Sequence, residues 1–160
     1  MSDKPDIFYD LYKTLYKTRE LEYSKKKIIL RSLFVGESWS WKVVGMSKKT
    51  FEIYKENKFK KVKNKFERHH FIPFAETAKK MLEGPLLTNE LWWKLVIKNE
   101  KTHLICKDEH KKGNSYKYFK IPIKRKLFSN KSVGWNYDAR EEEFLKEIKI
   151  DDITWKTQKV

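Results

Sequence analysis

The spacing of apolar residues predicts mainly helices in the first third of the chain. Apolar side chains recur every three or four positions from Ile7 to Tyr16, the pattern of an amphipathic helix. The next apolar run, KKIILRSLFV at 26–35, fits either a helix or a strand. The segment WSWKVVG at 39–45 predicts a strand that ends at Gly45, and Ser47 suits the N-cap of a following helix.

Strand and helix patterns alternate through the rest of the chain. HHFIPF at 69–74 predicts a short strand that Pro73 ends, and AETAKKMLEG at 75–84 predicts a helix. Thr88 or Asn89 can cap a helix over ELWWKLVIKN, and THLIC at 102–106 is rich in β-forming residues. KDEHKK then favours a helix N-terminus, YKYFKIPIKRKLF a basic strand, and DAREEEFLKEI a last helix. The mixture predicts an α+β fold.

Length and composition narrow the class of protein. The chain has 160 residues, of which 39% are hydrophobic, enough for the core of one domain. No apolar run is long enough to span a membrane, and the N-terminal residues lack the apolar centre of a signal peptide. We therefore expect a cytoplasmic protein. Its single cysteine, Cys106, excludes an intrachain disulfide and a cysteine-rich zinc cluster.

The net charge points to a polyanionic partner. At +15, the chain favours nucleic acid ahead of a membrane surface, although a lysine-rich soluble protein from an AT-rich genome would have a similar composition. Basic residues flank the histidine-containing segments and are the candidates for contacting phosphates. They are Lys60, Lys61, Lys63, Lys65, Lys111, Lys112, Lys124, Arg125 and Lys126.

Two segments about 40 residues apart carry the candidate chemistry. ERHHFIP contains two adjacent histidines on a predicted strand, whose side chains point to opposite faces. THLICKDEHKKG places a third histidine after a strand that ends in cysteine. Together the two segments resemble the HNH, or ββα-metal, endonuclease motif, over roughly a third of the chain.

The resemblance implies a role for each histidine. His69 and His110 correspond to metal ligands, and His70 to the general base that activates water. The central Asn of the motif has no clean counterpart, since Asn99 and His103 are the nearest candidates on either side of its usual place. Read by itself, His103 favours a structural role within its strand, whereas Arg68 could stabilise charge on the phosphate.

Phosphodiester hydrolysis fits these residue types. A neutral histidine can take a proton from water near neutral pH, and one divalent metal ion can neutralise the phosphate. A site with few protein ligands favours Mg²⁺ or Mn²⁺, because it leaves positions for water and phosphate. Three imidazoles would instead favour Zn²⁺ or Ni²⁺.

The expectation is therefore a bacterial or phage-encoded endonuclease, in one domain with three parts. Residues 1–64 would form a helical part that contacts DNA, 65–115 the ββα-metal core, and 116–160 a basic β-rich part. The resemblance implies cleavage of double-stranded DNA, of the restriction type, by a homodimer. A non-catalytic nucleic-acid-binding protein, and a non-specific or RNA-directed nuclease, are the alternatives.

Overall fold

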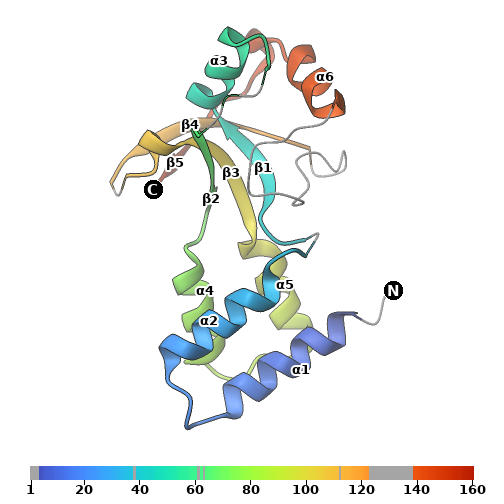
Figure 1. The fold of residues 1–160 in the computed structure, drawn as a ribbon, viewed down its shortest axis with the longest axis vertical. Helices are drawn as coiled ribbons and strands as arrows, with labels where there is room; N and C mark the ends of the chain where they lie inside the picture. The colour runs from blue at the N-terminus through green and yellow to red at the C-terminus, as the bar shows by residue number, and fades with distance from the viewer. Residues whose placement is uncertain (1–3, 38, 61, 63, 112, 123–138) are drawn as a thin grey trace. The chain divides into compact units, whose positions relative to one another are not determined.

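The computed structural model describes residues 4–37, 39–60, 62, 64–111, 113–122 and 139–160. The chain divides into two compact units, each made of discontinuous segments (Figure 1). Met1–Ser40 and Ile72–Glu100 form the helical unit, and Trp41–Phe71 and Lys101–Val160 form the sheet unit. The segment expected as one core, 65–115, is therefore distributed over both units, because Ile72–Glu100 belongs to the helical unit.

The helical unit packs its helices around a core of aromatic residues. Tyr12 and Trp92 are fully buried with their rings stacked at 5.6 Å, and Phe34 packs against Trp92 at 6.2 Å. The predicted amphipathic face of the first helix is confirmed by the burial of Tyr12 and Leu15, whereas Ile7 remains exposed. The helices are α1 (Lys4–Lys17), α2 (Tyr23–Phe34), α4 (Phe74–Leu82) and α5 (Asn89–Asn99).

Local signals in the sequence mark several helix starts. The Ser47 hydroxyl accepts a hydrogen bond from the Thr50 amide at 3.1 Å, so it caps α3 (Lys48–Glu56) as predicted. Thr88 caps α5 in the same way. The run 26–35, left open between helix and strand, lies largely within helix α2.

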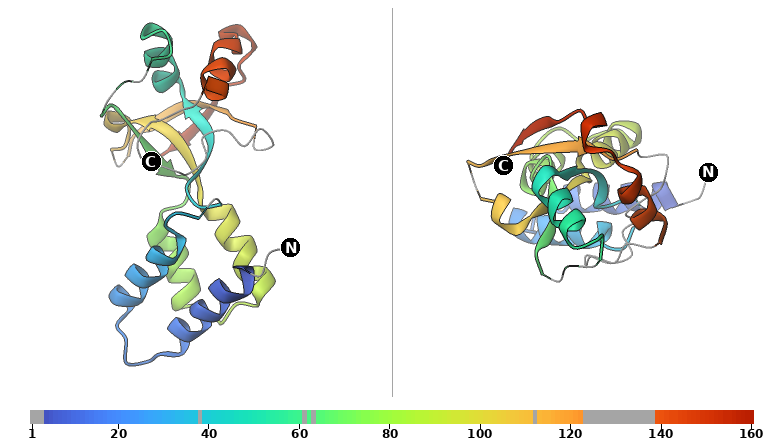
Figure 2. Two further views of the ribbon diagram at one scale, coloured as in Figure 1. Left: turned by 45° about the vertical axis from the view of Figure 1, so that its right-hand side comes forward. Right: turned by 90° about the horizontal axis from the view of Figure 1, so that it is seen from above.

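The sheet unit contains one mixed five-stranded sheet with the order β2-β3-β1-β4-β5 (Figure 2). The β1–β3 pair is parallel, and the β2–β3, β1–β4 and β4–β5 pairs are antiparallel. The strands are β1 (Lys42–Ser47), β2 (Phe66–His70), β3 (Lys101–Cys106), β4 (Ser115–Lys120) and β5 (Lys156–Lys159). The unit also contains the helix α6 (Ala139–Glu147) and two 3₁₀ helices, η1 (Lys107–Glu109) and η3 (Ile150–Asp152).

One face of the sheet is covered and carries the core of the unit. Phe66, Leu104 and Phe119 pack there with Phe51 of α3 and Leu145 of α6. Both helices lie on the same side of the sheet (Figures 1 and 2). Side chains alternate along each strand, so the residues between these core positions belong to the opposite face.

The α+β class is confirmed, but details differ from the expected core. A single turn of 3₁₀ helix, η1, follows β3 where the sequence favoured the start of a longer helix. The β5 strand was not predicted, since KTQK has little apolar alternation. None of the described helices is long and apolar enough to cross a membrane.

Burial of Cys106 makes the core of the sheet unit testable. Burial raises the pKa of its thiol to about 11, so the thiolate is scarce at pH 8. We expect native protein to react slowly with a thiol-specific disulfide reagent at pH 8, and one thiol per chain to react at once in denaturant. Rapid reaction of the native protein would contradict the packing of β3 against α3.

Candidate functional site

The β2 strand separates its functional side chains onto two faces. Glu67, His69 and Phe71 alternate onto the face opposite the core, because each is two residues from the next. In the β2–β3 ladder, His69 lies directly opposite His103 and Glu67 directly opposite Ile105. We call this side of the sheet the histidine face.

A tight turn brings His110 onto the histidine face. His110 follows η1, which is fixed by the Glu109 carboxylate: it accepts hydrogen bonds from the Cys106 amide at 2.8 Å and the Ser47 hydroxyl at 2.6 Å. The turn also lies close to β2, since the Lys107 amide donates to the Lys65 carbonyl at 3.0 Å. As a result, the rings of His69 and His110 meet edge to face, with centroids 4.5 Å apart.

Glu67 orients His110. The Glu67 carboxylate is hydrogen-bonded to Nδ1 of His110. A carboxylate can only accept this bond, so Nδ1 carries a proton, and Nε2 is the ring nitrogen left for another partner. Both side chains are partly exposed, at 31% for Glu67 and 42% for His110. His69 makes no hydrogen bond to the described residues, so its ring nitrogens are available.

His103 is buried in the middle of the same face. Its Nδ1 is hydrogen-bonded to the Tyr116 hydroxyl at 2.9 Å, and its ring packs against Phe71 and Tyr118 with centroids 3.8 and 3.9 Å away. The two tyrosines come from β4, on the far side of β1. They reach His103 because β1 presents Gly45 at this level, opposite His103 in the ladder.

Gly45 has no room for a side chain. A Cβ atom there would lie 2.5 Å from Nε2 of His103 and 2.9 Å from the Phe119 carbonyl oxygen. The His103 ring therefore occupies the space that a side chain at Gly45 would take. This close packing joins the aromatic residues of β2, β3 and β4 into one cluster across β1.

Burial keeps the histidines of this cluster neutral at physiological pH. Burial, with smaller effects of His110 and His70, lowers the pKa of His69 to about 4. Burial, with a smaller effect of His69, lowers the pKa of His103 to about 3. Tyr116 has a raised pKa, mainly from burial, and keeps its proton. Neutral imidazoles with free lone pairs can accept protons or bind metal ions.

Other residues expected at the site lie elsewhere. His70 and Arg68 are on the core side of β2, where His70 packs edge to face on Trp41 at 4.2 Å and Arg68 donates to the Trp41 carbonyl at 2.9 Å. Burial lowers the pKa of Arg68. Asn99 belongs to the helical unit, where its buried amide donates to the Thr77 hydroxyl at 2.8 Å.

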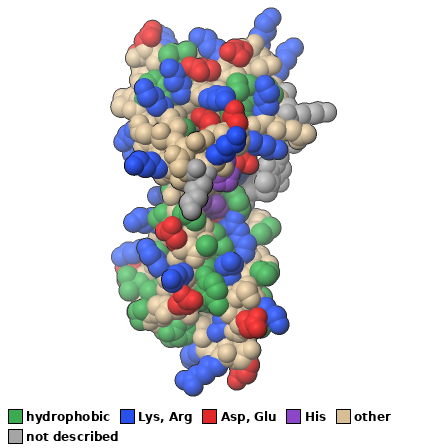
Figure 3. Space-filling view, turned by 90° about the vertical axis from the view of Figure 1, so that its left-hand side faces the viewer, with side chains coloured by type: hydrophobic (Ala, Val, Ile, Leu, Met, Phe, Trp, Pro, Cys, Tyr) green, Lys and Arg blue, Asp and Glu red, His purple; other side chains and the backbone are tan. Residues whose placement is uncertain are grey.

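Three of the nine candidate phosphate-contacting residues lie within the described ranges. Lys60, Lys65 and Lys111 are exposed, and Lys111 is the neighbour of His110. Histidine side chains reach the surface with lysine and arginine side chains near them (Figure 3). The remaining candidates, Lys61, Lys63, Lys112, Lys124, Arg125 and Lys126, lie outside the described residues.

Sequence reasoning missed three members of the histidine face, Glu67, Tyr116 and Tyr118. Period-two alternation was the available signal, since Glu67 precedes His69 by two positions and the two tyrosines are likewise two apart. Alternation alone, however, does not say which strands are neighbours. Within the described ranges, no group of three or more His, Cys, Asp or Glu side chains is arranged to hold a metal ion.

Comparisons with protein-family models, curated proteins and solved structures found no match for this chain.

The buried histidines predict a loss of stability in acid. His103 titrates at its ordinary pKa of 6.5 when unfolded but at about 3 when folded, so the unfolded chain binds more protons between these values. The sheet unit should therefore lose up to about 1.4 kcal/mol per pH unit from this residue as the pH falls below 6.5. Native-state hydrogen exchange of the β3 amides between pH 7 and 5 measures the slope.

His103→Gln removes one of the two histidines with a lowered pKa and should reduce this slope, leaving the part that His69 contributes, whatever its effect on stability at pH 7. Lys117→Gln, on an exposed position of β4, is the matched control and should leave the slope unchanged. Equal slopes for wild type and His103→Gln would contradict a buried neutral His103.

Proposed function

We propose that the protein is a nuclease that hydrolyses phosphodiester bonds of DNA on the histidine face. The observation that carries the proposal is the convergence of Glu67, His69 and His110. These residues come from the two separate segments that resemble an HNH motif, and they meet at a partly exposed site. A basic chain of net charge +15 supplies the attraction for a polyanionic substrate.

In this proposal His69 takes the proton from the attacking water. Its ring is half-buried and neutral, and its nitrogens make no hydrogen bond to the described residues. The resemblance alone gives this role to His70. Strand alternation favours His69 instead, because His70 projects from the other side of β2 and packs on Trp41.

Glu67 and His110 are the proposed ligands of a divalent cation. The Glu67 carboxylate now accepts a hydrogen bond from Nδ1–H of His110, so a cation held by both residues would take the place of this proton, with the His110 ring in its Nε2–H tautomer. One carboxylate with few other protein ligands suits Mg²⁺ or Mn²⁺. The resemblance assigns His69 and His110 instead, an all-imidazole pair that would favour Zn²⁺ or Ni²⁺. When bound, the cation would neutralise charge on the phosphate.

Lysines beside the turn would hold the phosphate backbone. Lys65 and Lys107 are exposed and joined through their backbones, and Lys111 follows His110 directly. Each would neutralise phosphate charge without reading sequence, so binding should weaken steeply as salt rises. Sequence-specific cleavage of double-stranded DNA by a homodimer would in addition require a palindromic site and two copies of the chain, and no described residue carries that part of the expectation.

Substitution of the converging residues tests the catalytic assignment. With plasmid DNA and Mn²⁺, His69→Ala should reduce the cleavage rate by roughly 10²- to 10⁴-fold, the usual contribution of a general base. His70→Asn is the matched control, one residue away on the opposite face, and should keep most of the rate if it remains folded. A large loss in His70→Asn with little in His69→Ala would reverse the two roles.

Metal dependence is a separate expectation. A chelator should abolish cleavage, and Mg²⁺ or Mn²⁺ should restore it. Glu67→Gln keeps a partner for His110 but removes the charge, so it should raise the Mn²⁺ concentration that gives half-maximal rate by roughly 10- to 100-fold. An unchanged cleavage rate in the presence of chelator would contradict a role for the cation, and catalysis would then depend on the histidines alone.

A non-catalytic nucleic-acid-binding protein is the second candidate. It is favoured by the burial of His70 and His103, because buried side chains that pack within a sheet often serve only to stabilise it. It predicts salt-sensitive DNA binding without cleavage in any divalent metal. Digestion of plasmid and of RNA side by side distinguishes it from both nuclease alternatives.

A further inference from the structure

A cavity of about 440 Å³ opens on the histidine face beside the proposed catalytic residues. Its walls come from the sheet unit alone, and the residues that define its chemistry are Phe71, Lys101, His103, Tyr118 and Lys120. Its volume lies in the range of pockets that hold small organic ligands. The residues named here are of two kinds, aromatic and basic.

The aromatic wall consists of partly exposed rings around a buried imidazole. Phe71 and Tyr118 each pack on the His103 ring, and their own centroids are 6.1 Å apart at 69°. This spacing is too close for a third ring between them, so a planar ligand would stack on their outer surfaces. His103 has no exposed surface, and its Nε2 has no hydrogen-bond partner among the described residues. An orphaned buried nitrogen is costly, and such groups in native proteins call for an explanation.

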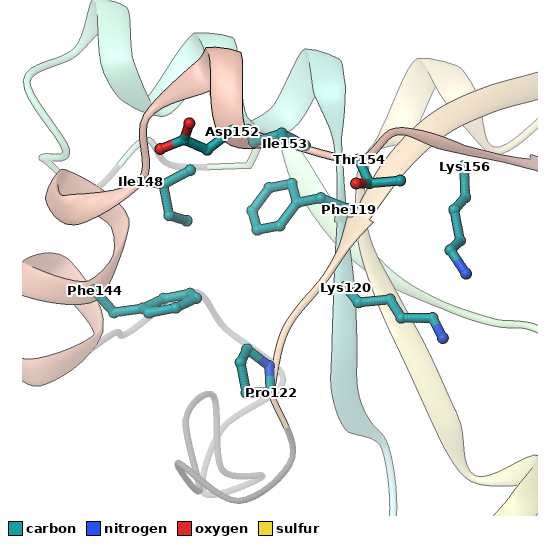
Figure 4. A pocket seen from close by; sticks show the side chains of 9 residues that line it. All are labelled: Phe119, Lys120, Pro122, Phe144, Ile148, Asp152, Ile153, Thr154 and Lys156. Atoms are coloured by element: carbon teal, nitrogen blue, oxygen red, sulfur yellow. The ribbon is translucent and has the colours of Figure 1, made fainter.

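The rim of the cavity is positively charged. Lys101 and Lys120 line it, and no lining residue among those described is acidic. Lys156 lies near Lys120, since β5 pairs with β4, and its pKa is lowered by that neighbouring ammonium group. Figure 4 shows the side chains of Lys120 and Lys156 extending toward each other. Cations that approach one another in this way form a site where an anion relieves their repulsion.

A second cavity, of about 300 Å³, shares Lys120 with the first. Phe119, Phe144 and Ile148 line it together with Lys120 and Lys156 (Figure 4). Asp152 also lines it and would repel an anionic ligand. Its apolar side chains belong to or pack against the core of the sheet unit. The cavity beside His103 is thus the stronger candidate for a ligand site.

The proposed catalytic residues do not line the cavity, but they lie next to residues that do. His103 lies directly opposite His69 in the β2–β3 ladder, where side chains on the same face are nearest neighbours. Tyr116 is close to both rings, at 6.2 Å from His69 and 5.8 Å from His103. A phosphate at His69 and His110 would therefore leave the adjacent nucleotide within reach of Phe71 and Tyr118.

We infer that this cavity binds one unstacked nucleotide of the DNA strand that is cleaved, with its base on Phe71 and Tyr118 and its phosphate at Lys101 and Lys120. Aromatic rings stack on any base, and lysines track the backbone, which is the combination found in single-strand-binding sites. The inference rests on the proposed function and narrows its substrate. A base in a duplex must leave the stack before it can reach such a cavity, so an already unpaired nucleotide is preferred.

Binding measured without cleavage tests the inference independently of catalysis. With a metal chelator present to prevent cleavage, the protein is titrated into three fluorescently labelled DNAs of one sequence: a single strand, a perfect duplex, and a duplex with one unpaired nucleotide. We expect the single strand and the bulged duplex to bind roughly tenfold more tightly than the perfect duplex. Equal affinity for all three would overturn the inference even if the protein cuts DNA.

Two variants test whether the cavity is the site of single-strand binding, and they differ in how much each could disturb folding. Tyr118→Leu removes a stacking ring, and Lys120→Gln changes only an exposed charge; each should weaken single-strand binding roughly five- to tenfold. Lys117→Gln, on the alternate face of the same strand, is the control for loss of a positive charge. If Lys120→Gln and Lys117→Gln weaken binding equally, and folded Tyr118→Leu binds like wild type, the cavity is not the site.

A competition arm distinguishes a DNA strand from a free nucleotide. Thymidine 5′-monophosphate should compete with the single strand only at concentrations far above those of the strand itself. If the free nucleotide binds as tightly as the strand, the assignment to DNA is overturned. Preferential binding of unpaired DNA by a protein that never cuts it would instead reject the nuclease and leave the nucleotide site in place.

Discussion

The antiparallel pairing of β2 with β3 is the interaction on which the site depends. It joins residues more than 30 positions apart in sequence and sets His69 against His103 and Glu67 against Ile105. The pairing also fixes the base of the turn after β3, because the Lys107 amide bonds to the carbonyl of Lys65. A shift of one residue in this register would put His70 on the histidine face and turn Glu67 and His69 toward the core side of the sheet.

The helical unit contributes to this arrangement through chain connectivity. Its second segment, Ile72–Glu100, lies between β2 and β3 in the sequence, whereas its first segment precedes β1. The unit has its own aromatic core around Trp92, and Glu100, just before β3, is buried with its carboxylate bonded to Ser40 at 2.6 Å and to Arg31 at 3.4 Å. In the sequence, β1 and β3 thus begin just after a segment of the helical unit, and β2 ends just before one.

Local sequence signals predicted much of the fold and part of the site. Caps at Ser47 and Thr88, apolar periodicity in the first helix, and alternation of His69 with His70 are properties of short segments, so they could be inferred without the fold. The turn carrying His110 was expected to open a longer helix. It remains a single 3₁₀ turn, stabilised by Glu109 bonded to the distant Ser47. The contribution of β4 depended on strand order, which no local pattern encodes.

Because of Gly45, substitutions at positions 45 and 103 can occur in one order but not in the other. Because the His103 ring and the Phe119 carbonyl oxygen both lie too close to position 45 for a Cβ atom, a larger residue there requires a smaller residue at position 103 and also a shift of the β4 backbone. The reverse order is open, since a smaller residue at 103 is compatible with glycine at 45. Descendants of this chain that differ at both positions would therefore have passed through replacement of the histidine first, and with it through loss of the bridge to Tyr116.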